Sequence, residues 1–237
     1  MTFYQFLFFF LEYASRASHE EYLHNWSSAS KHKSIHIRGP NTLEYYADSQ
    51  ISDARKSLEL NLEINWNKID FSKVDWTEVG PALIQTENYI PMSNYRFYFE
   101  LEIENIGDEN SIVAIGLSAR PPFFDSLPGL IDLSCGYYSD GSILHNGKND
   151  LFDQGDKYGK GDIVGCYGDL KNGLFYFTKN GFVVNEPRAN PTERIDIVSD
   201  KLFPTIGLKG DGTRIKSNFG KEKFIFFPDS KFALRML

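Results

Sequence analysis

The stretch YRFYFELEIE, residues 95–104, is the clearest strand signal in the chain. Its apolar side chains recur at every second position, at Phe97, Phe99, Leu101 and Ile103. The positions between them carry Tyr98, Glu100, Glu102 and Glu104. A period of two predicts a half-buried β-strand, with the first set in a core and the second facing solvent.

Further short apolar runs follow on both sides of this strand. They include PALIQT, SIVAIGLSA, DIVGCYG, LFYFTKNGFVV and LFPTIGL. Asn180-Gly181 and Asp140-Gly141 each separate two such runs, and Asn-Gly is a strong hairpin signal because a type I′ turn needs positive φ at both central residues. Turns at intervals of about 8–12 residues predict an antiparallel β-sandwich.

Composition limits the class of protein. The 237 residues are 41% hydrophobic and 15% aromatic, which is enough for a sizeable core. A net charge of −7 without a basic stripe argues against nucleic-acid binding. The two cysteines, Cys135 and Cys166, lie in strand-like runs, so we expect both to be small buried apolar residues. A disulfide between them is the alternative. We therefore expect a reducing compartment.

The chain divides into four parts. Residues 1–33 are expected to be an apolar and helical extension, followed by a strand-rich segment, 34–79, that packs on the sandwich. The sandwich domain itself covers 80–227, and 228–237 form a tail. The apolar run in residues 1–11 has three interpretations: a packed helix, an interfacial membrane anchor, or part of a membrane span.

No catalytic constellation stands out. His19 and His24 miss by one residue the spacing at which two helical histidines share a zinc ion. The motif GKGD at 159–162 lacks the spacing of a phosphate-binding loop, and Glu102 and Glu104 are explained by strand alternation. We expect no enzyme activity, no metal and no cofactor.

Six blocks in order resemble successive parts of a SPRY domain, across residues 80–227. The blocks are YRFYFELEIEN, VAIGLSARPPFFDSLPGL, CGYYSDGSILHNG, YGKGDIVGCYGDLKNGLFYFTKNG, LFPTIGLKGDG and IKSNFG. The resemblance implies an all-β, B30.2-like or concanavalin A-like sandwich of two antiparallel sheets. It also implies a non-enzymatic module, without cofactor or metal, that binds a protein or peptide through loops at one edge.

Two branches of that family are most similar. One is the Ran-binding-protein-M type. The other is the fungal SPRY adaptors of endosomes and vacuoles, which recruit a HECT-type ubiquitin ligase and carry a segment similar to IHIRGPNTLEYYAD. This chain departs from the family in having Leu130 in place of tryptophan and Tyr138 in place of histidine. It has no PPxY motif, since Phe124 stands where tyrosine is needed.

The proline-rich loop between two strands, ARPPFFDSLPGL, is the candidate partner-binding site. Its candidate partner-binding residues are Arg120, Phe123, Phe124 and Leu130. Of these, Arg120 and Phe123 are expected to make the contact, while Phe124 and Leu130, like Leu127, lean to packing. An arginine beside aromatic side chains has the composition of an interface hot spot. Tyr137 and Tyr138 follow on a strand, so one should point inward and the other outward, into a partner groove.

The resemblance implies a role in ubiquitin-dependent trafficking or turnover. The expected location is the cytoplasm, at the cytosolic face of endosomal or vacuolar membranes, with residues 1–11 as a membrane contact. A lectin-like carbohydrate-binding protein is the alternative, because lectin sandwiches share this architecture. A hydrolase on the same sandwich ranks third.

Overall fold

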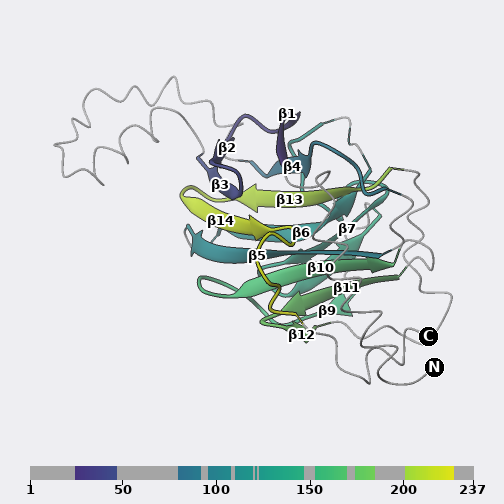
Figure 1. The fold of residues 1–237 in the computed structure, drawn as a ribbon. Coiled ribbons are helices and arrows are strands. Elements are labelled where there is room, and N and C mark those ends of the chain that lie inside the picture. Colours follow the sequence, from purple (N-terminus) through teal and green to yellow (C-terminus); the bar gives the residue numbers. More distant parts are fainter. Residues whose placement is uncertain are drawn as a thin grey trace, which may run out of the picture.

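The structure is a computed structural model, and it describes residues 25–46, 80–91, 96–107, 110–119, 121, 123–146, 153–169, 174–184 and 201–226. All regular structure in these residues is β. Two seven-stranded antiparallel sheets pack face to face, as Figure 1 shows. The predicted all-β sandwich is confirmed.

The first sheet, sheet A, has the strand order β1-β4-β13-β6-β7-β8-β9. Its strands are β1 (Trp26–Lys31), β4 (Ala82–Thr86), β13 (Phe203–Lys209), β6 (Ile112–Ser118), β7 (Ser134–Tyr138), β8 (Ser142–His145) and β9 (Asp153–Gln154). The second sheet, sheet B, has the order β12-β11-β10-β5-β14-β3-β2. Its strands are β12 (Phe182–Val183), β11 (Leu174–Lys179), β10 (Ile163–Asp169), β5 (Arg96–Ile106), β14 (Thr213–Asn218), β3 (Thr42–Tyr45) and β2 (Ile35–Arg38).

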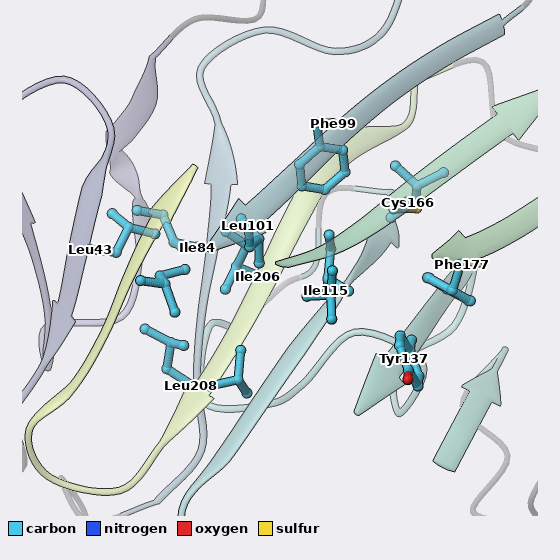
Figure 2. Close-up of a cluster of buried hydrophobic side chains, with 14 of the residues drawn as sticks. Leu43, Ile84, Phe99, Leu101, Ile115, Tyr137, Cys166, Phe177, Ile206 and Leu208 are labelled. Carbon is cyan, nitrogen blue, oxygen red and sulfur yellow. The ribbon is translucent and has the colours of Figure 1, made fainter. Parts of the chain in front are cut away.

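The core lies between the sheets and follows the alternation seen in the sequence. Figure 2 shows side chains of both sheets meeting there: Ile84, Ile115, Tyr137, Ile206 and Leu208 from sheet A, and Leu43, Phe99, Leu101, Cys166 and Phe177 from sheet B. In β5 all four predicted inward residues are buried. Burial of this apolar area is the main force that holds the two sheets together.

The predicted hairpin turns are also present. Asn180 and Gly181 have φ values of 50° and 83°, and Lys179 pairs with Phe182 across them, as a two-residue type I′ turn requires. At the second hairpin, Gly141 has a φ of 94° and its amide donates to the carbonyl of Tyr138. Asparagine and glycine are the residues that tolerate this left-handed backbone at least cost.

Two expected boundaries need correction. Strand β1 falls within the expected extension 1–33 but is part of the sandwich. Its Trp26 is buried, donates a 2.9 Å hydrogen bond to Ser217 Oγ, and has its ring centroid 5.2 Å from that of Phe219. Strands β2 and β3 do not pack on the sandwich but extend sheet B through pairing with β14. The sandwich therefore takes in strands from before residue 80.

Several expectations concern residues outside the described ranges. These are residues 1–24 of the apolar and helical extension, residues 47–79 of the strand-rich segment and the tail 228–237. Within the described ranges there is no helix long and apolar enough to cross a membrane.

Residues 219–226, here called the C-terminal strap, cross the outer face of sheet B. Figure 1 shows this yellow segment leaving β14 and passing over β5, β10 and β11 towards β12. The rings of Phe224 and Phe226 lie 4.8 and 5.2 Å from the ring of Tyr98. The strap thus provides the outer face of sheet B with an apolar cover.

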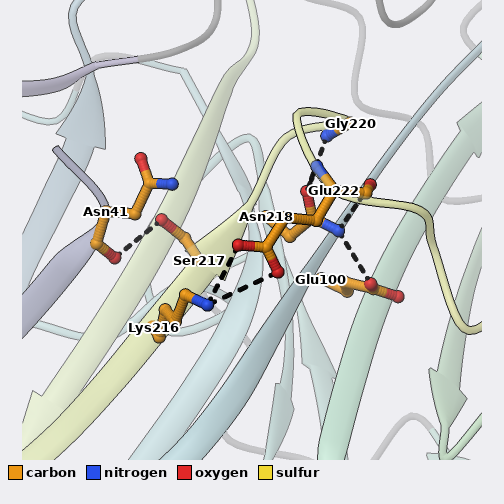
Figure 3. Close-up of polar contacts among 7 residues, drawn as sticks. All are labelled: Asn41, Glu100, Lys216, Ser217, Asn218, Gly220 and Glu222. Atoms are coloured by element: carbon orange, nitrogen blue, oxygen red, sulfur yellow. Dashed lines mark hydrogen bonds and ion pairs between the residues drawn. The ribbon is translucent and has the colours of Figure 1, made fainter.

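Glu100 holds the strap in place. The sequence predicted that its side chain faces solvent, and this prediction is wrong. Its carboxylate accepts hydrogen bonds from Asn218 Nδ2 at 3.0 Å, from the Ile225 amide at 3.2 Å and from the Tyr98 hydroxyl at 3.2 Å. Figure 3 shows the Asn218 bond beside the Lys216–Glu222 ion pair. The side chain is 5% exposed because the strap covers it, which strand alternation alone does not reveal.

Glu100 should give the stability of the fold a distinctive pH dependence. Burial raises its pKa above the ordinary 4.5, although its hydrogen bonds oppose the shift. Because the folded state keeps this proton to higher pH than the unfolded chain, the contribution of Glu100 to the free energy of unfolding falls as pH rises from 4.5 through the raised pKa. Urea unfolding of wild type and Glu100→Gln is measured from about pH 4 to about pH 7. The free energy of unfolding of wild type should fall relative to that of the variant as pH rises. If wild type instead becomes more stable relative to Glu100→Gln as pH rises, the assignment of a raised pKa to Glu100 is contradicted.

Candidate partner-binding surface

The loop between β6 and β7, residues 119–133, is here called the opening loop, and it folds back over the outer face of sheet A. Three neighbouring strands present small residues to it, namely Gly207 on β13, Ala114 on β6 and Gly136 on β7. A Cβ atom at Gly136 would lie 2.1 Å from the carbonyl oxygen of Pro128. The loop therefore lies against the sheet backbone, where larger side chains would keep it away.

Backbone and side-chain hydrogen bonds fix the loop at several points. The Tyr138 hydroxyl donates to the Pro128 carbonyl at 2.8 Å, and the Gly129 amide donates to Ser134 Oγ at 2.7 Å. The Leu83 amide of β4 donates to the Phe124 carbonyl at 2.8 Å. These bonds tie the loop to two strands, β7 and β4, so its exposed side chains are held in place.

The structure separates the loop residues by exposure. Phe123 is 70% exposed, whereas Phe124 and Leu130 are half-buried and Leu127 is buried. Leu127 packs with Ala114 and Tyr138 in a small apolar cluster, against which Leu130 also packs. Arg120 lies outside the described residues, so its expected partner contact remains a prediction.

The expectation for the tyrosine pair is half right. Tyr137 points inward and is fully buried, and its hydroxyl donates to the Asp156 carbonyl. Tyr138 does point to the outer face, but the opening loop covers it and leaves it 4% exposed, so it cannot sit in a partner groove as expected. Burial raises the pKa of both phenols, which keeps them as neutral donors.

A buried polar network anchors the start of the opening loop. Gln85 Nε2 donates to Ser118 Oγ at 2.8 Å and to the Ala119 carbonyl at 3.0 Å, and a 2.7 Å hydrogen bond joins Ser118 Oγ to Thr205 Oγ1. All three polar side chains are fully buried on the outer face of sheet A. The sequence signal for this network is a polar residue inside each of the apolar runs PALIQT, IGLSA and LFPTIG, and strand alternation alone does not reveal that these polar residues meet.

Beside the start of the loop lies a second exposed aromatic residue that the sequence did not single out. Tyr89 is 40% exposed, its ring lies 6.1 Å from the ring of Phe203, and Lys201 Nζ lies 5.3 Å above it. Phe203 pairs with Ser118, the last residue of β6 before the loop. Tyr89 and Phe123 therefore offer flat apolar surface, and Lys201 offers a charge.

The described residues contain no group of His, Cys, Asp or Glu that could hold a metal ion. Cys135 and Cys166 are free thiols on facing sheets, so they form no disulfide. Burial raises the pKa of Cys135 to about 12 and that of Cys166 well above its ordinary value, and neither is a thiolate at neutral pH. What this surface offers is apolar contact, hydrogen bonds and charge.

Removal of the Tyr138 hydroxyl should loosen the opening loop. In Tyr138→Phe the Pro128 carbonyl loses its donor inside a buried contact. We expect the free energy of unfolding to fall by about 1–3 kcal/mol, the usual cost of a buried unpaired acceptor. Urea denaturation measures it, and an unchanged midpoint at equal m value would show that the hydrogen bond does not hold the loop.

The structure is a β-sandwich in which a rigid scaffold holds a loop with an exposed aromatic side chain, an arrangement that suits a binding module. The family model for the SPRY domain matches residues 96–222, more than half of the chain. The chain belongs to the SPRY domain family. The matched range falls inside the predicted 80–227.

Similar proteins are homologues of Ran-binding proteins 9, 10 and M. The Drosophila melanogaster Ran-binding proteins 9/10 homolog is 31% identical over 172 residues, which is 72% of this chain and 17% of that protein. The Arabidopsis thaliana Ran-binding protein M homolog is 30% identical over 61% of this chain and 29% of its own length. Human Ran-binding protein 9 is 30% identical over 63% of this chain and 20% of its own length. The chain thus spans less than a third of each of these relatives.

Solved structures show the same fold. A crystal structure of a human SPRY domain is 23% identical, with a TM-score of 0.54, and the match covers 81% of this chain and 98% of that one. The SPRY domain of human HERC1 is 16% identical with a TM-score of 0.55, over 81% of this chain and 96% of that one.

Proposed function

We propose that this chain is a non-enzymatic protein-interaction module that recognises a peptide or folded protein through the opening loop. Phe123 is the central contact, with Arg120 three residues before it in the sequence and Tyr89 and Lys201 beside the start of the loop. The partner should offer an apolar side chain to these aromatic rings. Membership of the SPRY family, whose relatives here are Ran-binding protein homologues, supports this class of function.

One observation carries the proposal. Phe123 is 70% exposed, although the next residue is hydrogen-bonded to β4 and the loop beyond it is packed on sheet A. A large exposed aromatic residue on an unfixed loop would lose conformational freedom on binding, whereas here most of that loss has already occurred on folding. Exposed aromatic side chains held rigidly are typical of interface hot spots.

We further propose a role in ubiquitin-dependent trafficking or turnover, at the cytosolic face of endosomal or vacuolar membranes. The similarity of IHIRGPNTLEYYAD and VAIGLSARPPFFDSLPG to the fungal adaptors supports it. Because no PPxY motif is present, recruitment of a ligase would depend on another contact. The test is co-precipitation of a HECT-type ligase with this chain from cells that express both, and absence of the ligase under conditions that retain other partners would contradict the proposal.

The loop assignment is tested by affinity capture from cell lysate, followed by titration of the captured partner. Phe123→Ala should weaken binding about tenfold or more, the scale of a hot-spot residue. The matched control is Phe182→Ala, because Phe182 is similarly exposed, at 77%, on sheet B. Equal affinity of both variants and wild type would remove Phe123 from the interface.

A glycan array measures the carbohydrate-binding alternative with the same wild-type protein. Retention on specific glycans, with no protein partner captured, would favour the lectin-like function over the one proposed.

A further inference from the structure

Leu133, the last residue of the opening loop, has a backbone conformation that a leucine side chain disfavours. Its φ is 52°, in the left-handed region, where the Cβ atom comes too close to the following carbonyl oxygen. Besides glycines, the described part of the chain has positive φ only at Leu133, Asn146 and Asn180, and asparagine tolerates this conformation. Leu133 is therefore the one large apolar residue that the described fold holds there.

The hydrogen bonds around Leu133 impose this conformation. The Leu133 carbonyl accepts the Ala119 amide at 3.0 Å, which closes the base of the opening loop. The next residue, Ser134, pairs with Ser118 of β6, and its hydroxyl accepts the Gly129 amide at 2.7 Å. Since the backbone is fixed on both sides, glycine or asparagine would meet the same geometry at lower cost. The fold requires the backbone conformation at position 133, but it does not require leucine.

Packing does not explain the leucine either. Leu133 is 38% exposed, and it belongs to none of the apolar clusters in the described part of the chain. In the same loop, Leu127 is only 4% exposed and packs with Ala114 and Tyr138. Backbone strain that the core does not repay is typical of binding sites, where the strained residue has another use.

Leu133 lies at the same end of sheet A as other candidate contact residues. Its hydrogen-bond partner Ala119 directly precedes Arg120 in the sequence. On the other side of β6, Phe203 pairs with the last residue of that strand, and its ring lies 6.1 Å from the ring of Tyr89. The strand order β13-β6-β7 thus brings the Tyr89 region, the start of the opening loop and Leu133 to one end of the sheet.

We propose that Leu133 is a further contact residue of the opening loop, and that its side chain packs against an apolar group of the partner that Phe123 binds. This inference rests on the proposed function, because it assigns Leu133 to the same interface. Leucine at this position lowers the stability of the free chain and enlarges the apolar area buried in the complex. It also contributes to specificity, since a partner with a charged group there would bury that charge unpaired.

The test compares Leu133→Gly with Leu133→Ala in the full 237-residue chain, because both remove the side chain but only glycine relieves the backbone strain. The probe is the protein that wild type captures from lysate, purified and titrated against each variant. Both variants should bind about tenfold or more weakly than wild type. Leu133→Gly should nevertheless unfold about 2–4 °C higher than Leu133→Ala. Leu133→Met keeps an apolar side chain of similar volume and should retain most of the affinity.

Affinity and stability therefore change independently if Leu133 acts through its side chain. Wild-type affinity in both Leu133→Gly and Leu133→Ala overturns the proposal. An affinity that follows stability, with Leu133→Gly close to wild type and Leu133→Ala weakened, also overturns it, because position 133 would then act only through loop geometry. If Phe123→Ala weakens binding and the Leu133 variants do not, the opening loop is the interface and only the Leu133 contact fails. If none of these variants weakens binding, or wild type captures no protein, the proposed function fails as well.

Discussion

Phe99→Ala is expected to lower the free energy of unfolding by about 3–5 kcal/mol, which is the range for removal of a buried phenylalanine ring. Phe99 is 1% exposed, stacks on Phe219 at 5.4 Å and lies opposite Cys166 of β10. Its loss opens a cavity in the centre of the sandwich. Because domains of this kind are stable by about 5–15 kcal/mol, this single change should remove a large share of the total.

Urea denaturation followed by fluorescence measures the loss, with Phe123→Ala as the matched variant. Phe123 has the same side chain at 70% exposure, so its truncation should change stability by no more than about 0.5 kcal/mol. Similar losses in the two variants would mean that the sheets do not pack as described.

Gly136→Ala is expected to displace the opening loop and to destabilise the domain by about 1–3 kcal/mol, as overpacking of a close contact does. The new Cβ atom would lie 2.1 Å from the Pro128 carbonyl oxygen, a contact that neither backbone can relieve without movement. Since the loop carries Phe123, the affinity for the captured partner should fall as well. Stability and affinity are therefore coupled at this position.

Gly159→Ala provides the control for that substitution. No atom lies within 4 Å of a Cβ at Gly159, and its φ is outside the left-handed region, so alanine fits there. We expect stability equal to wild type or slightly higher, because alanine restricts the unfolded chain. Binding of the partner by Gly136→Ala with wild-type affinity would show that the position of the loop does not matter for recognition.

Much of the fold could be predicted from the sequence because strand alternation is a local signal. The inward residues of β5, the hairpin at Asn180-Gly181 and the SPRY family assignment needed only neighbouring residues or the order of family blocks. The boundary at Trp26 was wrong because its evidence is a contact with Ser217, which lies 191 residues further along the chain.

The candidate site was harder to predict for the same reason. Tyr138 was correctly assigned to the outer face, but its burial depends on a loop that folds back over the strand, and no local pattern encodes that cover. Glu100 was misassigned similarly, since the strap that buries it comes from the other end of the domain. Phe123 could be singled out in advance, because it is a large apolar residue in a proline-rich loop that had no predicted place in a strand.

The central claim is that the opening loop, held rigid on sheet A, is the surface that meets the partner. Amide hydrogen exchange of the chain, alone and with its captured partner, tests this most directly. We predict that binding increases protection in residues 119–133 and near Tyr89, with exchange in the C-terminal strap unchanged. Protection confined to the C-terminal strap, with no change in residues 119–133, would contradict the claim.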